Sequence, residues 1–294
     1  MPRRILIIGC GYVGLAAGAE LVRQGHRVWG LRRSRRANPE LQSAGIVPLN
    51  ADVTIPSTLP GLSERFDWVI HCLSASGGGP REYRQTYVEG TRCVLNWLAA
   101  APPDRLVYTS STSVYGQTDG GVVDENSATI PRSPAGVVLL EAEQLLLGKA
   151  SVPASVLRVG AIYGPRRSYW LDQWRAGAAR LEGRGTRILN MIHRDDVAGV
   201  LCAALTCGKP GRIYNAVDDE PVCQLDLFQW LSARLGQALP PASPPEAPGA
   251  GNRGLTSKRV SNRRLKEELG YQLRFPTFRH GFEQILAGRD TGPV

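Results

Sequence analysis

The stretch "RILIIGCGYVG" at residues 4–14 constrains the fold more than any other segment of the chain. Its apolar run is typical of a buried strand, and the pattern over 12–24 is typical of a helix. Between them, Gly9, Gly11 and Gly14 form a G-x-G-x-x-G motif. In such a turn the first glycine permits the tight bend, and the second lets the backbone approach a pyrophosphate. The third lets the helix pack closely on the strand. The segment predicts a dinucleotide site, and the alternative is a glycine-rich turn without a ligand.

Further apolar runs alternate with helical patterns along the first half of the chain. Five more strands are predicted, at "HRVWGLR", "GIVPLN", "FDWVIHCL", "DRLVYTSS" and "ASVLRVG". Alternation of this length is typical of a parallel, doubly wound sheet with helices on both faces. We therefore predict an α/β protein with a Rossmann-type doubly wound parallel sheet and a smaller, interleaved C-terminal substrate lobe.

The second half of the chain is less regular and is divided between these two parts. Residues 1–165 are expected to form the NADP-binding Rossmann domain, and residues 187–217 to return to it. Residues 166–186 and 218–294 are expected to form the smaller substrate-binding lobe. Within that lobe, the Pro-, Gly- and Ala-rich stretch 238–254 predicts a mobile loop.

The end of the second predicted strand indicates which dinucleotide the site prefers. An NAD site normally has an acidic residue there for the ribose 2′-hydroxyl, whereas an NADP site has arginine for the 2′-phosphate. Here the position is Arg32, followed by Arg33 and Ser34. Two guanidinium groups and a hydroxyl suit a phosphate dianion. The sequence therefore favours NADP, with NADPH preferred over NADH, and the alternative is a solvated basic loop.

Composition excludes several other classes of protein. Apolar residues make up 43% and charged residues 21% of the chain, which is ordinary for a globular protein and unlike a disordered one. The net charge of +9 comes mainly from scattered arginines, so nucleic-acid binding is not expected. The six cysteines lack metal-ligand spacing, and no apolar stretch reaches transmembrane length. We expect a cytoplasmic protein that binds no metal and no membrane.

Seven further segments carry recognisable signatures. They are "ADVT" (51–54), "VIHCLSA" (69–75), "YVEGTRCVLNWL" (87–98), "YTSSTSVYG" (108–116), "LRVGAIYGP" (157–165), "IHRDDVA" (192–198) and "YNAVDDEPV" (214–222). In their order and spacing they resemble the extended short-chain dehydrogenases/reductases of the NAD-dependent epimerase/dehydratase family, and more narrowly its atypical members. The residues that motif and resemblance together assign to the dinucleotide are Gly9, Gly11, Tyr12, Val13, Gly14, Arg32, Arg33, Ser34, Asp52, Val53, Leu73, Ser74 and Ala75.

The chain departs from the family pattern where the catalytic pair belongs. The resemblance implies a Y-x-x-x-K helix at "SPAGVVLLEAEQLLL" (133–147), where the two positions are Ala135 and Leu139. In the family the tyrosine is the general acid/base, and the lysine lowers its pKa and holds the nicotinamide ribose. The first family glycine falls on Ile8. The phosphate-binding arginine of many sugar-nucleotide epimerases falls on Leu189, which argues against a UDP-sugar substrate.

Other residues could replace the missing pair. Ser111, at the position of the family's catalytic serine or threonine, and Thr112 could bond a substrate oxygen. Tyr115 could turn towards the cofactor, and His193 titrates in the range that acid–base catalysis needs. The alternatives are a packing role for Tyr115 and a structural role for His193. The residues expected to bind the substrate are Ser111, Tyr163, Arg166, Arg167, Trp170 and His193.

Two functions remain open from the sequence. The first is an NADP-dependent oxidoreductase or epimerase/dehydratase that acts on a small substrate, with hydride chemistry carried by the cofactor. The second is a non-catalytic NADP-binding sensor, which the loss of the catalytic pair favours.

The helix over 134–148 is apolar nearly all round and must be covered on both sides. In the family this helix pairs with its counterpart, so we expect a homodimer through helices 81–100 and 134–148.

Overall fold

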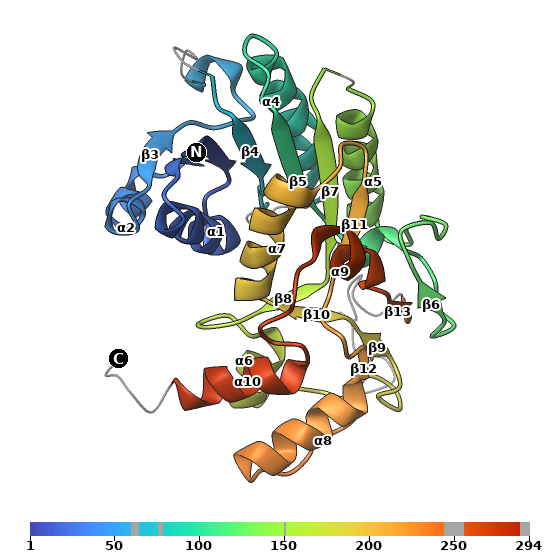
Figure 1. Ribbon diagram of the computed structural model, residues 1–294. Helices are drawn as coiled ribbons and strands as arrows, with labels where there is room; N and C mark the ends of the chain where they lie inside the picture. Colours follow the sequence, from blue (N-terminus) through green and yellow to red (C-terminus); the bar gives the residue numbers. More distant parts are fainter. Residues whose placement is uncertain (60–64, 76–78, 150, 244–255, 289–294) are drawn as a thin grey trace.

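A seven-stranded parallel sheet forms the centre of the computed structural model, which describes residues 1–59, 65–75, 79–149, 151–243 and 256–288 (Figure 1). The strand order is β11-β7-β5-β4-β1-β2-β3, and every neighbouring pair is parallel. The strands are β1 (Arg4–Ile8), β2 (Arg27–Arg32), β3 (Val47–Asn50), β4 (Trp68–His71), β5 (Arg105–Ser111), β7 (Ala154–Val159) and β11 (Ile213–Ala216). The predicted Rossmann-type doubly wound sheet is confirmed.

Helices cover both faces of the sheet. One face carries α1 (Tyr12–Arg23), α2 (Asn38–Ser43), α7 (Arg194–Cys207) and α9 (Arg263–Leu269). The other carries α3 (Pro80–Arg84), the π-helical turn η3 (Gln85–Glu89), α4 (Gly90–Leu98) and α5 (Pro134–Leu147). Side chains of a strand alternate between its two faces. Accordingly, Ile5 and Ile7 of β1 enter the core on the α1 side, and Leu6 and Ile8 enter the core on the α5 side.

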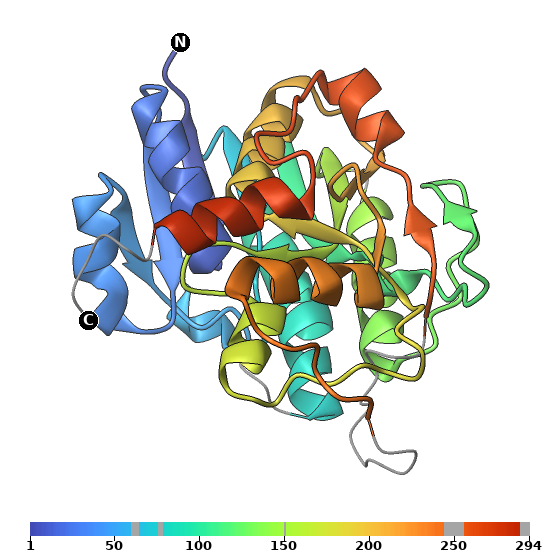
Figure 2. The ribbon, with the colours of Figure 1, turned by 90° about the horizontal axis from the view of Figure 1, so that it is seen from below.

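A third apolar core lies below the sheet in Figure 1. It is built by α6 (Tyr169–Arg175), α8 (Gln224–Leu235) and α10 (Phe278–Ala287), and both ribbon views place α8 and α10 side by side (Figures 1 and 2). Between α8 and α10 the chain returns to the sheet, because Leu265 and Leu269 of α9 enter the core on the α1 side. Most of the loop predicted at 238–254 lies outside the described residues.

Short elements connect these layers. They are β6 (Val122–Val123), β8 (Ala161–Tyr163), β9 (Ile188–Leu189), β10 (Met191–His193), β12 (Val222–Cys223), β13 (Arg259–Val260), η1 (Arg35–Ala37), η2 (Pro56–Thr58) and η4 (Thr112–Val114). Strand β10 pairs with β8, β12 with β9, and β13 with β6. The last of these pairs joins the C-terminal region to a loop that leaves the sheet after β5.

A buried ion pair joins α5 to the sheet. Arg158 of β7 lies 2.7 Å from Glu143 of α5, and the two side chains are 4% and 2% exposed. Arg158 also donates to the hydroxyl of Tyr115 at 2.9 Å, and that hydroxyl donates to Asn215 of β11 at 2.9 Å. The network ties one helix to two strands through groups that water does not reach. Removal of one charge would leave the other buried without compensation.

We expect Glu143→Ala to lower the free energy of unfolding by about 3–5 kcal/mol, because the charge of Arg158 would stay buried and unpaired. The matched control is Glu141→Ala on the same helix, which breaks a surface ion pair with Arg84 and should change stability little. Urea unfolding followed by circular dichroism measures both variants. Equal losses in the two variants would contradict the prediction.

Candidate functional site

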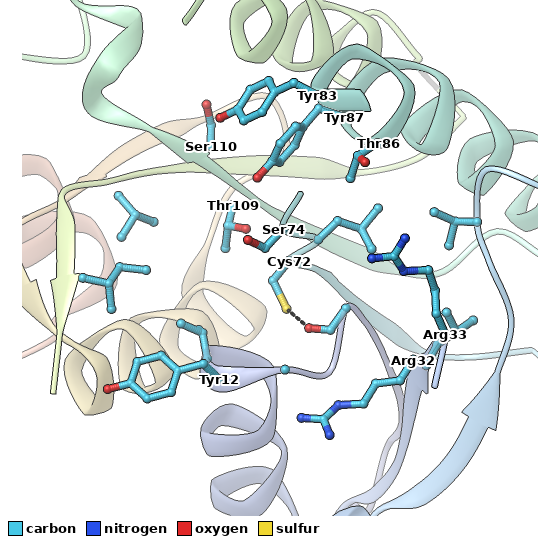
Figure 3. A pocket seen from close by; sticks show the side chains of 18 of the residues that line it. Tyr12, Arg32, Arg33, Cys72, Ser74, Tyr83, Thr86, Tyr87, Thr109 and Ser110 are labelled. Carbon is cyan, nitrogen blue, oxygen red and sulfur yellow. Dashed lines mark hydrogen bonds between the residues drawn. The ribbon is translucent and has the colours of Figure 1, made fainter. Parts of the chain in front are cut away.

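A cavity of about 500 Å³ lies at the carboxyl ends of the central strands (Figure 3). Ligands of open α/β sheets bind at this edge. The predicted dinucleotide residues that line it are Gly9, Gly11, Tyr12, Val13, Arg32, Arg33, Ser34, Asp52, Val53, Leu73 and Ser74. Gly14 and Ala75 lie outside the lining. Residues far apart in the sequence therefore meet around one cavity.

The glycine loop has the shape that a dinucleotide phosphate requires. Gly9 has φ +85°, and a Cβ there would lie 2.6 Å from the carbonyl oxygen of Cys72. A Cβ on Gly14 would lie 2.9 Å from the oxygen of Gly9, so this position supports packing of α1 on β1. At Gly11 the nearest atom to an added Cβ is 3.9 Å away. The backbone of Gly11 is thus open to close approach, which fits a pyrophosphate.

The start of α1 is suited to an anion. The helix begins at Tyr12 without a side-chain cap or an acidic residue in its first turn, so its first N–H groups favour negative charge. The Tyr12 hydroxyl donates to the oxygen of Pro165 at 3.1 Å, and the guanidinium carbons of Arg167 and Arg194 lie 5.3 and 5.1 Å from its ring centre. Burial raises the pKa of Tyr12, which keeps the hydroxyl a donor.

Arg166, which does not line the cavity, has φ +62°, an uncommon conformation for a residue with a side chain.

The two arginines after β2 have different surroundings. Arg32 donates to the carbonyl oxygen of Cys10 and forms an ion pair of 3.0 Å with Glu40 of α2. The guanidinium group of Arg33 diverges from that of Arg32 (Figure 3). Glu40 was not singled out from the sequence, because its contact with Arg32 depends on where α2 lies relative to the end of β2. It offsets part of the positive charge at this end of the cavity.

Ala135 and Leu139, the positions where the family resemblance implies tyrosine and lysine, differ in their relation to the cavity. Leu139 lines the cavity with an apolar side chain and is 3% exposed. Ala135 is half-buried in the first turn of α5 and does not line the cavity. The start of this helix is capped by Ser133, whose Oγ accepts from the amide of Gly136 at 3.0 Å. Neither Ala135 nor Leu139 has a group that could bond a ribose or move a proton.

The predicted catalytic hydroxyls separate in the structure. Ser111 lines the cavity, and its Oγ accepts from the amide of Ser113 at 3.1 Å. Thr112 is buried in η4 and does not line the cavity. Tyr115 is fully buried in the ion-pair network that holds α5. This geometry matches the packing role that was the alternative for Tyr115.

His193 also lies outside the cavity lining. It is fully buried at the start of α7, where its Nδ1 accepts from the amide of Asp195 at 3.2 Å. Its ring centre lies 3.9 Å from that of Phe275. Burial lowers the pKa of His193, with Asp195 opposing the shift, so the neutral imidazole is favoured. These contacts are those of a helix cap.

The predicted substrate residues are divided between two regions. Arg167 lines the cavity. Tyr163 stacks on Phe282 with ring centres 5.0 Å apart, and Trp170 meets Phe228 edge-on at 5.5 Å. Both rings pack in the core formed by α6, α8 and α10. The two aromatic side chains therefore contribute to a core rather than to the cavity lining.

Several polar side chains of the cavity were given no role from the sequence. Among them are Tyr83, Thr86, Tyr87, Thr109 and Ser110 (Figure 3). The rings of Tyr83 and Tyr87 have centres 4.5 Å apart, and the Tyr87 hydroxyl accepts from the amide of Ala75 at 3.3 Å. Their four-residue spacing on a predicted helix was the one available signal, since it places both rings on one face.

Metal and membrane chemistry find no support in the described part of the chain. No cluster of three or more His, Cys, Asp or Glu side chains there is arranged to hold a metal ion. None of the helices there combines the length and apolar character that a bilayer crossing needs. Cys10, beside the glycine loop, is a neutral thiol, because burial raises its pKa to about 12.

Comparisons with known proteins agree with this geometry. Protein YeeZ of Escherichia coli (strain K12) is 25% identical over 282 residues, which cover 93% of this chain and 97% of YeeZ. The 2-alkyl-3-oxoalkanoate reductase of Stenotrophomonas maltophilia (strain K279a) is 29% identical over 252 residues, which cover 79% of this chain and 76% of the reductase.

A solved structure extends the similarity over nearly the whole chain. A Methylobacillus flagellatus protein, described as a candidate NAD-dependent epimerase/dehydratase, superposes with a TM-score of 0.79 and 35% identity, covering 99% of this chain and 100% of that one. The family model named NAD dependent epimerase/dehydratase matches residues 5–216. Apart from Arg4 at the start of β1, these residues include every strand of the central sheet and the whole glycine loop. The chain therefore belongs to the NAD dependent epimerase/dehydratase family.

Proposed function

We propose that the protein is an NADP-dependent oxidoreductase that acts on the carbonyl group of a small substrate. The observation that carries the proposal is the single cavity that joins Arg32 and Arg33 at the end of β2 to Ser111 at the end of β5. A bound nicotinamide dinucleotide would supply or accept a hydride there. The protein's part is to bind, to orient and to exclude water.

Named residues account for the phosphates, the adenine and the ribose of a dinucleotide. Gly11 and the first turn of α1 would hold the pyrophosphate, with Arg167 close to that turn through its contact with Tyr12. Asp52 and Val53 would border the adenine, as the family resemblance implies, and both line the cavity. Leu73 and Ser74 would run along the phosphates and the ribose.

The arginine end of the cavity supports NADP over NAD. Arg32, Arg33 and Ser34 surround the place where the end of β2 meets the adenosine ribose in this fold. The carboxylate of Glu40 is paired with Arg32, so it is engaged and does not substitute for an acidic residue at the end of β2. A 2′-phosphate would meet positive charge there.

The substrate end of the cavity supports a small carbonyl compound rather than a sugar nucleotide. Leu189 is buried in the core of the smaller lobe, at the position where many sugar-nucleotide epimerases of the family bind phosphate through arginine. The name of the Stenotrophomonas maltophilia relative describes reduction of a 3-oxo acid. We extend that class, ketones and 3-oxo acids, to this chain.

The second candidate, a sensor that binds NADP without turnover, is favoured by Ala135 and Leu139.

The two helices α4 and α5 are proposed to form a homodimer interface. Val137 of α5 is 52% exposed, and Leu140, Leu145 and Leu147 are only partly buried. Trp97 of α4 is also partly buried. An apolar helix face of this kind is stabilised when a partner covers it.

We expect light scattering to give twice the chain mass of 31.9 kDa, because a second copy would cover the exposed face of α5. Val137→Glu should shift the protein towards the monomer, since the new charge would be buried in the interface. Val122→Glu, at an exposed valine away from α5, is the matched control. A monomer in the wild type at micromolar concentration would contradict the prediction.

Calorimetric titration should show NADPH binding at least about tenfold more tightly than NADH, because charge-assisted contacts to the 2′-phosphate contribute about 1.5–3 kcal/mol each. Arg32→Ala and Arg33→Ala should each weaken NADPH binding about tenfold and leave NADH binding nearly unchanged. Arg36→Ala is the control, since Arg36 belongs to the same basic run but does not line the cavity. Equal affinities for NADPH and NADH would refute the NADP assignment.

Oxidation of NADPH should follow when the purified protein is mixed with the right member of a panel of aldehydes, ketones and 3-oxo acids. The absorbance of NADPH measures turnover directly. Tight NADPH binding with no turnover across the whole panel would favour the sensor over the oxidoreductase.

A further inference from the structure

One side of the cavity carries polar groups that neither the family pattern nor the proposed function uses. Figure 3 shows Tyr83, Tyr87 and Ser110 across the cavity from Tyr12. Tyr83 belongs to α3, and its side chain extends into this cavity. Helix α3 directly precedes the π-helical turn η3, which carries Tyr87. Single π turns of this kind are frequent at functional sites.

These groups share one face of the sheet with the position of the missing lysine. Leu106 and Tyr108 of β5 belong to the core on the α5 side, together with Tyr87 and Leu139. Strand alternation places Ser110 on that same face. The hydroxyls therefore lie on the face from which a family member would project its catalytic pair.

The unpaired hydroxyl of Ser110 indicates that a ligand binds in this region. Its side chain is 7% exposed, and its Oγ has no hydrogen-bond partner among the described residues. Buried hydroxyls are almost always bonded, so such a group calls for a partner that binds from the cavity. The neighbouring Ser111 differs, because its Oγ already accepts from a backbone amide.

Tyr83 lines the cavity with a phenol that can donate a hydrogen bond. Burial, reinforced by the phenol of Tyr87, raises the pKa of Tyr83, so the phenol keeps its proton at neutral pH. The next residue, Arg84, forms two hydrogen bonds of 2.6 Å with Glu141 and fixes α3 against α5. Tyr83 is therefore held at a defined distance from the helix that lacks the family's tyrosine.

We propose that Tyr83 donates a proton to the substrate oxygen in place of the tyrosine absent at position 135, with Ser110 as a second hydrogen-bond donor to that oxygen. The inference rests on the proposed function, since it concerns the same carbonyl site. Reduction adds a hydride to the carbonyl carbon and a proton to its oxygen, and the C=O π pair becomes the lone pair that takes the proton. The hydride is the cofactor's part, and Tyr83 supplies the proton.

The proton balance closes at Tyr83. Its Oη–H bond breaks as the substrate O–H bond forms, and a proton from bulk solvent, relayed by water in the open cavity, reprotonates the phenolate. An alkoxide is a stronger base than a phenolate, even one whose pKa is raised by burial, so the transfer is downhill. A protonated phenol also polarises the carbonyl before hydride arrives, which is how a positioned acid contributes.

The test compares Tyr83→Phe, which removes one oxygen atom, with the wild type. Isobutyramide is the binding probe, because its carbonyl oxygen accepts a hydrogen bond and is not reduced. We expect Tyr83→Phe to weaken isobutyramide binding to the NADPH complex about tenfold, the effect of one hydrogen bond. NADPH affinity should stay within about twofold, and turnover with the best panel substrate should fall at least about a hundredfold. Ser110→Ala should weaken isobutyramide binding in the same direction.

Tyr214→Phe is the matched control, because Tyr214 is a buried tyrosine of β11 that does not line the cavity. It should leave isobutyramide binding and turnover unchanged. Values for Tyr83→Phe within twofold of the wild type in both measurements overturn the inference. If the wild type binds no NADPH, the proposed function itself is wrong. A wild type that binds NADPH but not isobutyramide leaves the cofactor assignment standing and overturns the role of Tyr83.

Discussion

The geometry of the site depends on the close approach of two backbone segments at the β1–α1 turn. Gly9 has φ +85°, and the carbonyl oxygen of Cys72 occupies the space that its Cβ would need. Because β1 and β4 are neighbours, this contact brings the end of β4 against the glycine loop. The same turn aims the first N–H groups of α1 along the carboxyl edge of the sheet. A larger residue at Gly9 would push apart the two strands whose ends form the floor of the cavity.

Helix α5 carries an apolar side chain and a buried ion pair where the family resemblance implies a catalytic helix. Leu139, at the position where the resemblance implies lysine, forms part of the cavity wall, and Glu143, one turn further on, forms the buried ion pair with Arg158. The helix is thus retained by packing and by charge pairing rather than by chemistry. The same network holds the hydroxyl of Tyr115 between Arg158 and Asn215 and away from the cavity. Under the proposed function, the proton would come from another element, and Tyr83, directly before η3, is the residue that we propose for this role.

Much of this architecture could be predicted from local patterns. The buried strands of a parallel sheet are continuous apolar runs, so β1, β4 and β5 could be located directly, and the glycine spacing identified the β1–α1 turn. Eleven of the thirteen residues assigned to the dinucleotide line one cavity. The two exceptions have physical reasons. Gly14 faces β1 to let the helix pack, and the amide of Ala75 is bonded to Tyr87.

By itself, the sequence determined the fold class, the position of the glycine loop, the basic end of β2 and the alanine and leucine at positions 135 and 139, where the family resemblance implies tyrosine and lysine. These features depend on residue type and short spacing, which are visible along the chain. Only the tertiary structure decided which side chains meet. It paired Arg32 with Glu40, buried His193 and Tyr115, and brought Tyr83 and Ser110 into one cavity. Such contacts depend on how helices from distant parts of the chain pack on the sheet, and no local pattern encodes that packing.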